Sequence, residues 1–241
     1  MRTIFALLSG MALVSCSGGA RSLPVAPALP TDQMALIQPS DSYKLLFSFN
    51  ASDGQEPIGG LAAVKGTLYG ATRNGGEHGD GAFFKITTRG KQTVLYSFKA
   101  GSDGFTSVTP PTFMNGVLYG TTPYGGTSQS NGTVFRMTTR GKETVLYRFN
   151  GSPDGGVPQA PLIGVGGVLY GTTCSGGTSN HGTVFQITPS GAEKVIYSFQ
   201  GSPKDGQCPE AALTDVKGKF YGTASSGGSK SNGIVFAVTT S

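Results

Sequence analysis

Few residues of this sequence could carry out acid–base or metal chemistry. The chain has two histidines, His78 and His181, which is too few for most metal or acid–base sites. It contains no HExxH, GxSxG or P-loop motif. Four aspartates, each followed by glycine, could form a ring of carboxylates around a cation: Asp53, Asp103, Asp154 and Asp205. Calcium takes about six to eight clustered oxygen ligands and no DxDxD spacing occurs, so we expect each aspartate to close its own turn. We predict no catalytic residue, metal or cofactor.

These aspartates belong to a unit that occurs four times. A Gly-x-Leu/Phe-Tyr-Gly segment recurs with tyrosines spaced by 50, 51 and 51 residues, at Tyr69, Tyr119, Tyr170 and Tyr221. An Asp-Gly pair stands sixteen residues before each tyrosine, and a Gly-Gly pair follows each one. Self-similarity at a fixed period of this length is the signature of a repeat architecture.

Each unit is predicted to contain four short strands, A to D, rich in Val, Ile, Thr, Tyr and Phe and bounded by glycine. Strand A is exemplified by residues 61–64, and strand B is the Leu-Tyr-Gly-Thr segment. Strand C covers residues 83–87, 134–138, 184–188 and 235–239, and strand D covers residues 94–98, 145–149 and 195–199. The 39 glycines exclude a helical alternative, since each would cost about 1 kcal/mol in a helix interior.

Four-stranded units at this period predict an all-β fold, a four-bladed β-propeller with kelch-like blades of four antiparallel strands. The last unit stops after strand C, whereas Lys44–Phe49 matches strand D of the third unit, Lys194–Phe199, position by position. We therefore expect residues 44–49 to form a strand that pairs with the C-terminal blade near Phe236 and closes the ring. An open solenoid would not need this permutation.

The amino-terminal residues are predicted to be an export signal and a tether. Arg2 precedes an apolar run, residues 4–14, that is shorter than the about 20 residues needed to span a bilayer. The run ends in Leu-Val-Ser-Cys16, which resembles the lipobox of bacterial lipoproteins. The resemblance implies cleavage before Cys16 and its acylation, with palmitate among the acyl chains. The alternative is an ordinary signal peptide with a cysteine nearby. The expected domains are a signal peptide (1–15), the lipidated Cys16 with a disordered Pro/Gly-rich tether (16–42), and the propeller (43–241).

The repeat itself resembles a known family. Gly-x-Leu-Tyr-Gly-Thr-Thr-x-x-Gly-Gly, followed by Gly-Thr-Val-Phe, is similar to the tandem GloVer repeats of bacterial choice-of-anchor surface proteins, over residues 43–241. The resemblance implies an exported protein and no settled biochemical activity. Kelch and WD40 repeats have comparable periods, but the tryptophan that marks both is absent from this chain.

Charge and targeting signals narrow the possible partners. The net charge of +5 comes from basic residues spread singly, without the clustered stripe expected of a nucleic-acid-binding protein. A lipid anchor implies a membrane as one partner, and we expect a monomer. Ser17, where an aspartate would favour retention at the inner membrane, indicates the outer membrane or cell surface.

The loops between strands B and C and the D–A connections between repeats should share one face, because alternate loops of antiparallel blades lie on opposite faces. Length differences between repeats fall on that face, and repeat proteins often bind ligands where insertions are tolerated. The candidate binding residues there are Arg73, Glu77, His78, Tyr124 and His181. His181 occupies a position that Asn or Asp fills in other copies, which also fits a role in a turn.

Two cysteines fall in neighbouring loops of this face. Cys174 lies in the B–C loop of the third repeat and Cys208 in the connection to the fourth. An exported compartment permits oxidation, so we predict a disulfide, with two free thiols as the alternative.

Three functions remain open from the sequence. The favoured hypothesis is a lipid-anchored binding or scaffold module of the cell envelope, for a glycan, peptide or envelope protein. An extracellular carbohydrate-active enzyme, a hydrolase or lyase, would need paired acids or a His/Arg/Tyr cluster that breaks the repeat symmetry. A third possibility is a domain that only spaces or decorates the surface.

Overall fold

The structure is a computed structural model that describes residues 43–239. The chain divides into two units, residues 1–44 and residues 45–241, and the fold described below is that of the second unit. The predicted signal peptide, lipidated Cys16 and tether lie outside the described residues. Among the described residues no helix is long and apolar enough to cross a membrane.

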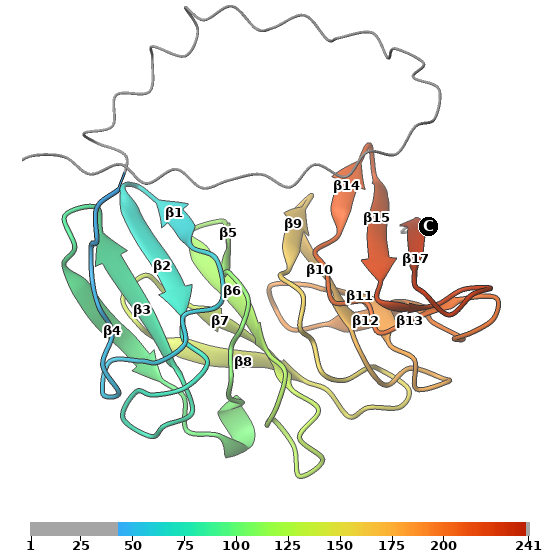
Figure 1. The fold of residues 1–241 in the computed structure, drawn as a ribbon, viewed down its shortest axis with the longest axis horizontal. Helices are drawn as coiled ribbons and strands as arrows, with labels where there is room; N and C mark the ends of the chain where they lie inside the picture. The colour runs from blue at the N-terminus through green and yellow to red at the C-terminus, as the bar shows by residue number, and fades with distance from the viewer. Residues whose placement is uncertain (1–42, 240–241) are drawn as a thin grey trace, which may run out of the picture. The chain divides into compact units, whose positions relative to one another are not determined.

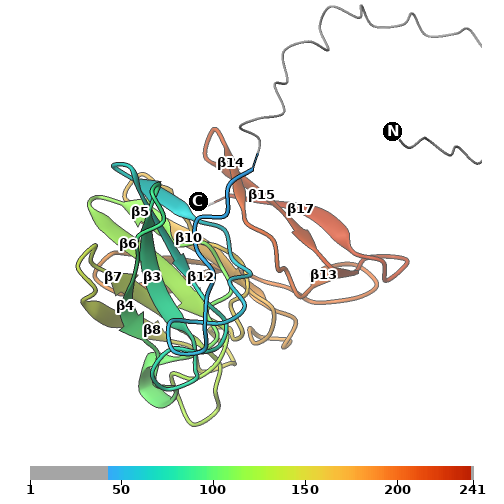
Figure 2. The same cartoon turned by 60° about the vertical axis from the view of Figure 1, so that its left-hand side comes forward.

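Antiparallel sheets follow one another along the chain (Figures 1 and 2). The first three sheets have four strands each, paired in chain order. The first contains β1 (Ala62–Val64), β2 (Thr67–Ala71), β3 (Ala82–Thr87) and β4 (Gln92–Ser97). The second contains β5 (Thr112–Met114), β6 (Val117–Thr122), β7 (Thr133–Met137) and β8 (Glu143–Arg148). The third contains β9 (Ile163–Val165), β10 (Val168–Thr173), β11 (Thr183–Ile187) and β12 (Glu193–Ser198).

The fourth sheet has three strands, β14 (Thr214–Val216), β15 (Lys219–Ala224) and β17 (Ile234–Thr239). Two short strands, β13 (Gly206–Gln207) and β16 (Ser226–Gly227), pair beside it. Within residues 43–239 the helical structure is one 3-10 turn, Gly101–Asp103. The predicted strands A to D are therefore confirmed to within two residues in the first three repeats, and strands A to C in the fourth.

The predicted closure of the ring is not found. Over residues 43–239, β17 pairs with β15 alone, and residues 43–50 form no strand. Residues 45–49 lie against the first repeat instead, with the Phe49 ring centroid 4.9 Å from that of Phe84. Phe49 thus packs on the first repeat, and the segment makes no β-ladder hydrogen bond to the described residues of β17. The described residues thus establish an all-β fold of successive antiparallel sheets without a closed ring.

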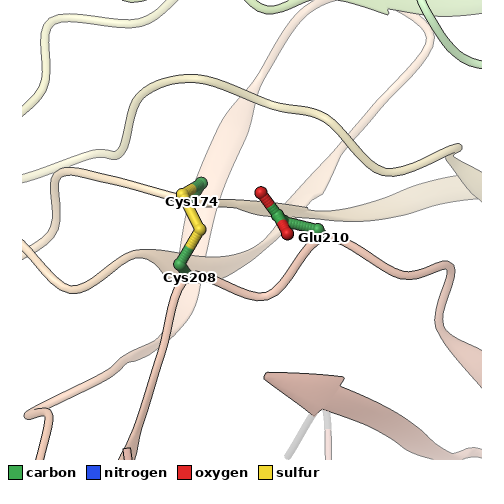
Figure 3. A group of neighbouring side chains, drawn as sticks. All are labelled: Cys174, Cys208 and Glu210. Carbon is green, nitrogen blue, oxygen red and sulfur yellow. A yellow bond between two sulfur atoms is a disulfide. The ribbon is translucent and has the colours of Figure 1, made fainter. Parts of the chain in front are cut away.

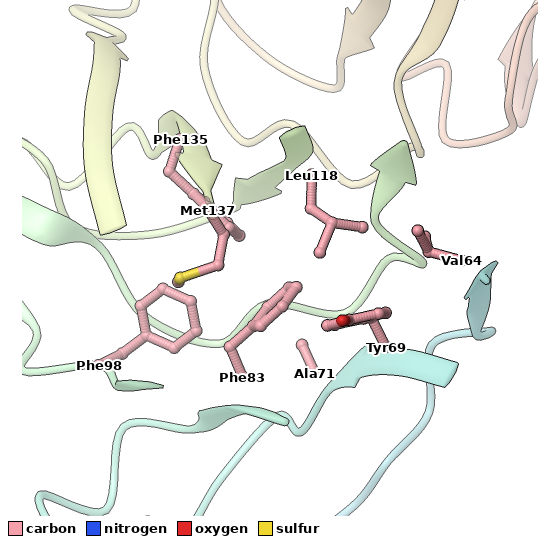
Figure 4. Packing of buried hydrophobic residues seen from close by; sticks show 8 residues of the cluster. All are labelled: Val64, Tyr69, Ala71, Phe83, Phe98, Leu118, Phe135 and Met137. Atoms are coloured by element: carbon pink, nitrogen blue, oxygen red, sulfur yellow. The ribbon is translucent and has the colours of Figure 1, made fainter. Parts of the chain in front are cut away.

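The hydrophobic core lies between consecutive sheets. The first cluster joins side chains of the first two repeats: Val64, Tyr69, Ala71, Phe83, Phe98, Leu118, Phe135 and Met137 (Figure 4). Corresponding clusters join the second repeat to the third, around Phe149 and Phe185, and the third to the fourth, around Phe199 and Phe220. A sheet of four short strands therefore buries its apolar face only against its neighbour.

The Tyr-Gly pair of each repeat serves this packing. The tyrosine is buried against the next repeat in the first three copies, at Tyr69, Tyr119 and Tyr170. The glycine leaves room for an aromatic ring on strand C. A Cβ added at Gly120 would stand 2.5 Å from Cζ of Phe135, far inside van der Waals contact.

Gly120→Ala is therefore expected to destabilise the fold by about 1–3 kcal/mol, the usual cost of overpacking a core. Gly60→Ala is the matched control, because a Cβ there would meet only Pro110 at 3.4 Å. Chemical denaturation of both variants checks this. Equal stability of the two variants would contradict the role assigned to this glycine.

Candidate binding site on the loop face

The Asp-Gly aspartates close the connections between repeats. In three of them a tyrosine hydroxyl of the preceding strand D donates to the carboxylate: Tyr96 to Asp103 (2.5 Å), Tyr147 to Asp154 (2.5 Å) and Tyr197 to Asp205 (2.9 Å). A backbone N–H also donates to each, from Lys99, Asn150 and Gln200. These contacts are turn contacts, as the sequence predicted.

The sequence reasoning missed the tyrosine partner. Its signal is a tyrosine two residues before the last phenylalanine of strand D, seven or eight residues before the aspartate. Asp53 lacks this partner because the equivalent residue is Phe47, which has no hydroxyl. Asn50 takes its place, with Nδ2 2.6 Å from Oδ2 of Asp53.

A glutamate at the start of strand D adds a second carboxylate to two of these junctions. Burial, and next the charge of Asp103, raise the pKa of Glu143 to about 7, against the smaller lowering effect of Arg148. Burial, and next the charge of Asp154, raise the pKa of Glu193 to about 7, against the smaller lowering effect of a hydrogen bond from Tyr147. One carboxylate oxygen of each glutamate is buried without a hydrogen-bond partner. The first repeat has the neutral Gln92 at this position.

A pocket of about 210 Å³ lies among the loops of the first three repeats. Its lining residues come from the D–A connections and from the first residues after strand B: Ile58, Arg73, Thr106, Val108, Pro123, Tyr124 and Gln159. Ile58, Val108 and Gln159 are equivalent positions of successive repeats, as are Arg73 and Pro123. The pocket is thus formed by equivalent positions with different side chains, so it is asymmetric.

Two of its side chains could hold a ligand directly. The Arg73 guanidinium lies 3.6 Å from the Glu56 carboxylate, and both side chains are half-exposed. Tyr124 is partly exposed, and its ring stands 5.6 Å from that of Phe105, tilted by 32°. The Phe105 N–H donates to the Tyr124 carbonyl, which fixes the two backbones together. The pocket therefore offers a cation and an aromatic ring on a braced backbone.

The structure brings together two of the five predicted binding residues, Arg73 and Tyr124. Glu77 and His78 form an exposed pair, 3.9 Å apart, in the B–C loop of the first repeat and do not line the pocket. The His181 ring packs against Gly201, and its carbonyl accepts from the Cys208 N–H at 3.0 Å. His181 therefore stabilises the turns around it, as the sequence also allowed.

Cys174 and Cys208 form a disulfide in the structure, as predicted (Figure 3). The bond joins the B–C loop of the third repeat to the connection into the fourth. Glu210 lies beside it, and these three residues are the one close group of metal-ligand types within residues 43–239. Because the two sulfurs are bonded to each other, Glu210 is left as a single carboxylate, which gives no basis for proposing a metal site here.

Repeated four-stranded sheets joined by Asp-Gly connections define a repeat-built all-β protein with a loop face. The family model for the Gloeobacter/Verrucomicrobia repeat matches residues 35–236. The chain belongs to this family, which confirms the resemblance predicted from the Tyr-Gly and Gly-Gly motifs. No curated protein matches.

Solved structures give a more distant similarity. One, assigned to the gluconolactonases, has 15% sequence identity and a TM-score of 0.42, over 72% of this chain and 60% of that chain. Another, a gluconolactonase from Xanthomonas campestris, has 14% identity and a TM-score of 0.44, over 72% and 59% of the two chains. This chain thus spans about three-fifths of the length of the structures it matches.

The half-buried Glu143 and Glu193 predict a stability that depends on pH. Their folded-state pKa, about 7, lies above the ordinary 4.5, so folding favours the protonated carboxyls. That contribution is fully present below pH 4.5 and is lost as the pH rises through 7. At pH 8 the double variant Glu143→Gln, Glu193→Gln should therefore unfold about 2–4 °C above the unmodified protein.

Thermal unfolding at pH 8 and pH 5 checks this, and the difference should shrink at pH 5. Glu77→Gln is the control, because the Glu77 side chain is exposed. An equal gain at both pH values would contradict the assignment of the buried charge.

Proposed function

We propose that this protein is an exported β-propeller, anchored by lipid to the cell envelope, that binds a ligand in the pocket around Arg73 and Tyr124. In this proposal each of the four repeats forms one blade. The observation that carries it is the asymmetry of the pocket. The packing phenylalanine of strand C recurs in all four repeats and that of strand D in the first three, whereas the side chains at the pocket positions differ.

The pocket chemistry supports a ligand with both an apolar face and a polar group. Ile58 and Val108 give an apolar wall, Tyr124 a partly exposed ring, and Gln159 an amide. The Arg73 guanidinium can form charge-assisted hydrogen bonds to a carboxylate or carbonyl. A glycan or a peptide segment, free or carried by an envelope protein, has this combination.

A binding role is supported over catalysis by the same residues. None of the pocket-lining residues is Asp, Glu, His or Cys, and the nearby Glu56 carboxylate is paired with Arg73. Hydrolysis of a glycosidic bond commonly uses two carboxyl groups on either side of it. The lining of this pocket supplies neither.

Arg73→Ala is expected to weaken binding to a panel of immobilised polysaccharide fragments and peptides about tenfold or more, because a hydrogen bond to a charged group is lost. Tyr124→Ala should weaken it as well. Arg140→Ala, on an exposed C–D turn, is the matched control. Unchanged binding in Arg73→Ala would overturn the site. Turnover of a bound glycan that is lost in Glu77→Gln or His78→Ala would establish the enzymatic alternative instead.

The anchor is a separate part of the proposal and rests on the Leu-Val-Ser-Cys16 motif. Two or more acyl chains hold a protein stably at a membrane, since each buried methylene contributes about 0.8 kcal/mol. In a bacterial host, Cys16→Ser should move the protein from the detergent phase to the aqueous phase of a detergent-partition experiment, with Cys208→Ser as control. Retention of Cys16→Ser in the detergent phase would contradict lipidation at this residue.

A further inference from the structure

Neighbouring repeats are joined by one backbone hydrogen bond that recurs at every junction. The donor is the N–H of a residue with positive φ in the D–A connection. The acceptor is the carbonyl just before the B–C loop glycine of the preceding repeat. The three bonds are Thr106 to Asp80 (3.1 Å), Val157 to Asn131 (2.8 Å) and Cys208 to His181 (3.0 Å).

The fourth sheet has the carbonyl acceptor of such a junction, but among residues 43–239 no following repeat supplies the donor. The carbonyl of Asn232, at the equivalent position, accepts no hydrogen bond from residues 43–239. Val235 of β17 is 78% exposed, whereas its counterparts Val134 and Val184 are fully buried. Tyr221 is 37% exposed, whereas the equivalent tyrosines of the other repeats are buried.

An open pocket of about 580 Å³ occupies the same place. Its lining includes Glu210, Ser225, Asn232, Gly233 and Val235. At the second and third junctions a proline follows the donor and packs on the B–C loop glycine, whereas Ser107 follows the donor Thr106 at the first. A Cβ added at Gly132 would stand 2.8 Å from Cδ of Pro158, and one added at Gly182 would stand 3.0 Å from Cδ of Pro209. Gly233 is the equivalent glycine, and no proline of the described residues covers it in this way.

The first repeat presents the donating half. Residues 45–49 have the sequence of a strand D and already pack on the first repeat as a preceding strand D would. The Leu46 carbonyl faces Gly90, just as the Leu95 carbonyl faces Gly141 at the next junction. The Phe49 and Phe84 rings are 4.9 Å apart, as Phe149 and Phe185 are at 5.2 Å.

The outer side of this segment is open. Leu45 is 63% exposed, and the segment makes no strand pairing. Glu56 has the positive φ of the junction donors, 55°, followed by Pro57, and its N–H donates to no acceptor among residues 43–239. The first repeat thus supplies the three features that the fourth sheet lacks: a strand D segment, a backbone N–H donor at Glu56 and the proline Pro57 that follows it.

We propose that the open junction is filled by a second copy of this chain. Residues 45–49 of one copy add as a fourth strand to β17 of the other, and Glu56 and Pro57 dock on Asn232 and Gly233. Made at both ends, the interface closes two copies into a ring, since a head-to-tail contact closes when its rotation permits. From the sequence we expect a monomer, and the proposed dimer replaces that expectation.

Single-cysteine variants test this directly. The register of β11 with β12 pairs Val184 with Tyr197, which places Phe47 opposite Val235. Phe47→Cys and Val235→Cys proteins, refolded together and oxidised, should form a covalent dimer containing one of each. Val216→Cys, exposed on the other edge strand of the same sheet, is the control and should give none with Phe47→Cys.

Closure within one chain is the competing outcome. It would give a monomeric intrachain disulfide in the Phe47→Cys, Val235→Cys double variant and no cross-link between the single variants. That result, or a monomeric mass of the full chain in sedimentation, overturns the proposal. Val235→Lys should halve the sedimentation mass without changing the far-UV circular dichroism. Neither Phe47 nor Val235 lines the ligand pocket, so failure of this test leaves the proposed binding site unaffected.

Discussion

The packing of strand D of one repeat on strand C of the next is the constraint on which the structure depends. Edge-on ring pairs recur at each junction, Phe98 with Phe135 at 5.5 Å, Phe149 with Phe185 at 5.2 Å and Phe199 with Phe236 at 5.0 Å. A single repeat cannot bury its apolar face alone, so each sheet depends on the neighbour that covers that face. Stability is therefore distributed over junctions, and an end of the array is a face without its neighbour.

The same constraint creates the loop face. Each D–A connection must cross from the outer strand of one sheet to the first strand of the next. The Tyr–Asp hydrogen bonds and the N–H to carbonyl bond hold it there. The Tyr and Asp of the first contact recur at all three junctions and the second contact uses the backbone alone, whereas the positions of Ile58, Val108 and Gln159 are free to differ. Binding chemistry can therefore vary on this face without a change in the packing that supports it.

The same connections place negatively charged carboxylates at the junctions. Asp103 and Asp154 are needed to close their turns, and a glutamate on the next strand D brings a second carboxylate near each of them. Two carboxylates in a partly buried junction favour a protonated form. The neutral Gln92 shows that the position can be filled without this charge.

The sequence by itself determined the repeats, the strands within them and the turn role of the Asp-Gly aspartates, and it favoured the Cys174–Cys208 bond over two free thiols. These follow from local periodicity and from loops brought together by repeat symmetry. Only the tertiary structure decided which loop residues meet. Arg73 and Tyr124 share a pocket because loops of different repeats converge, whereas His78 and His181 stay outside it. The tertiary structure also decided that residues 45–49 pack on the first repeat and that, among the described residues, β17 pairs with β15 alone. Whether the last sheet meets the first depends on the rotation summed over all junctions, which no single repeat encodes.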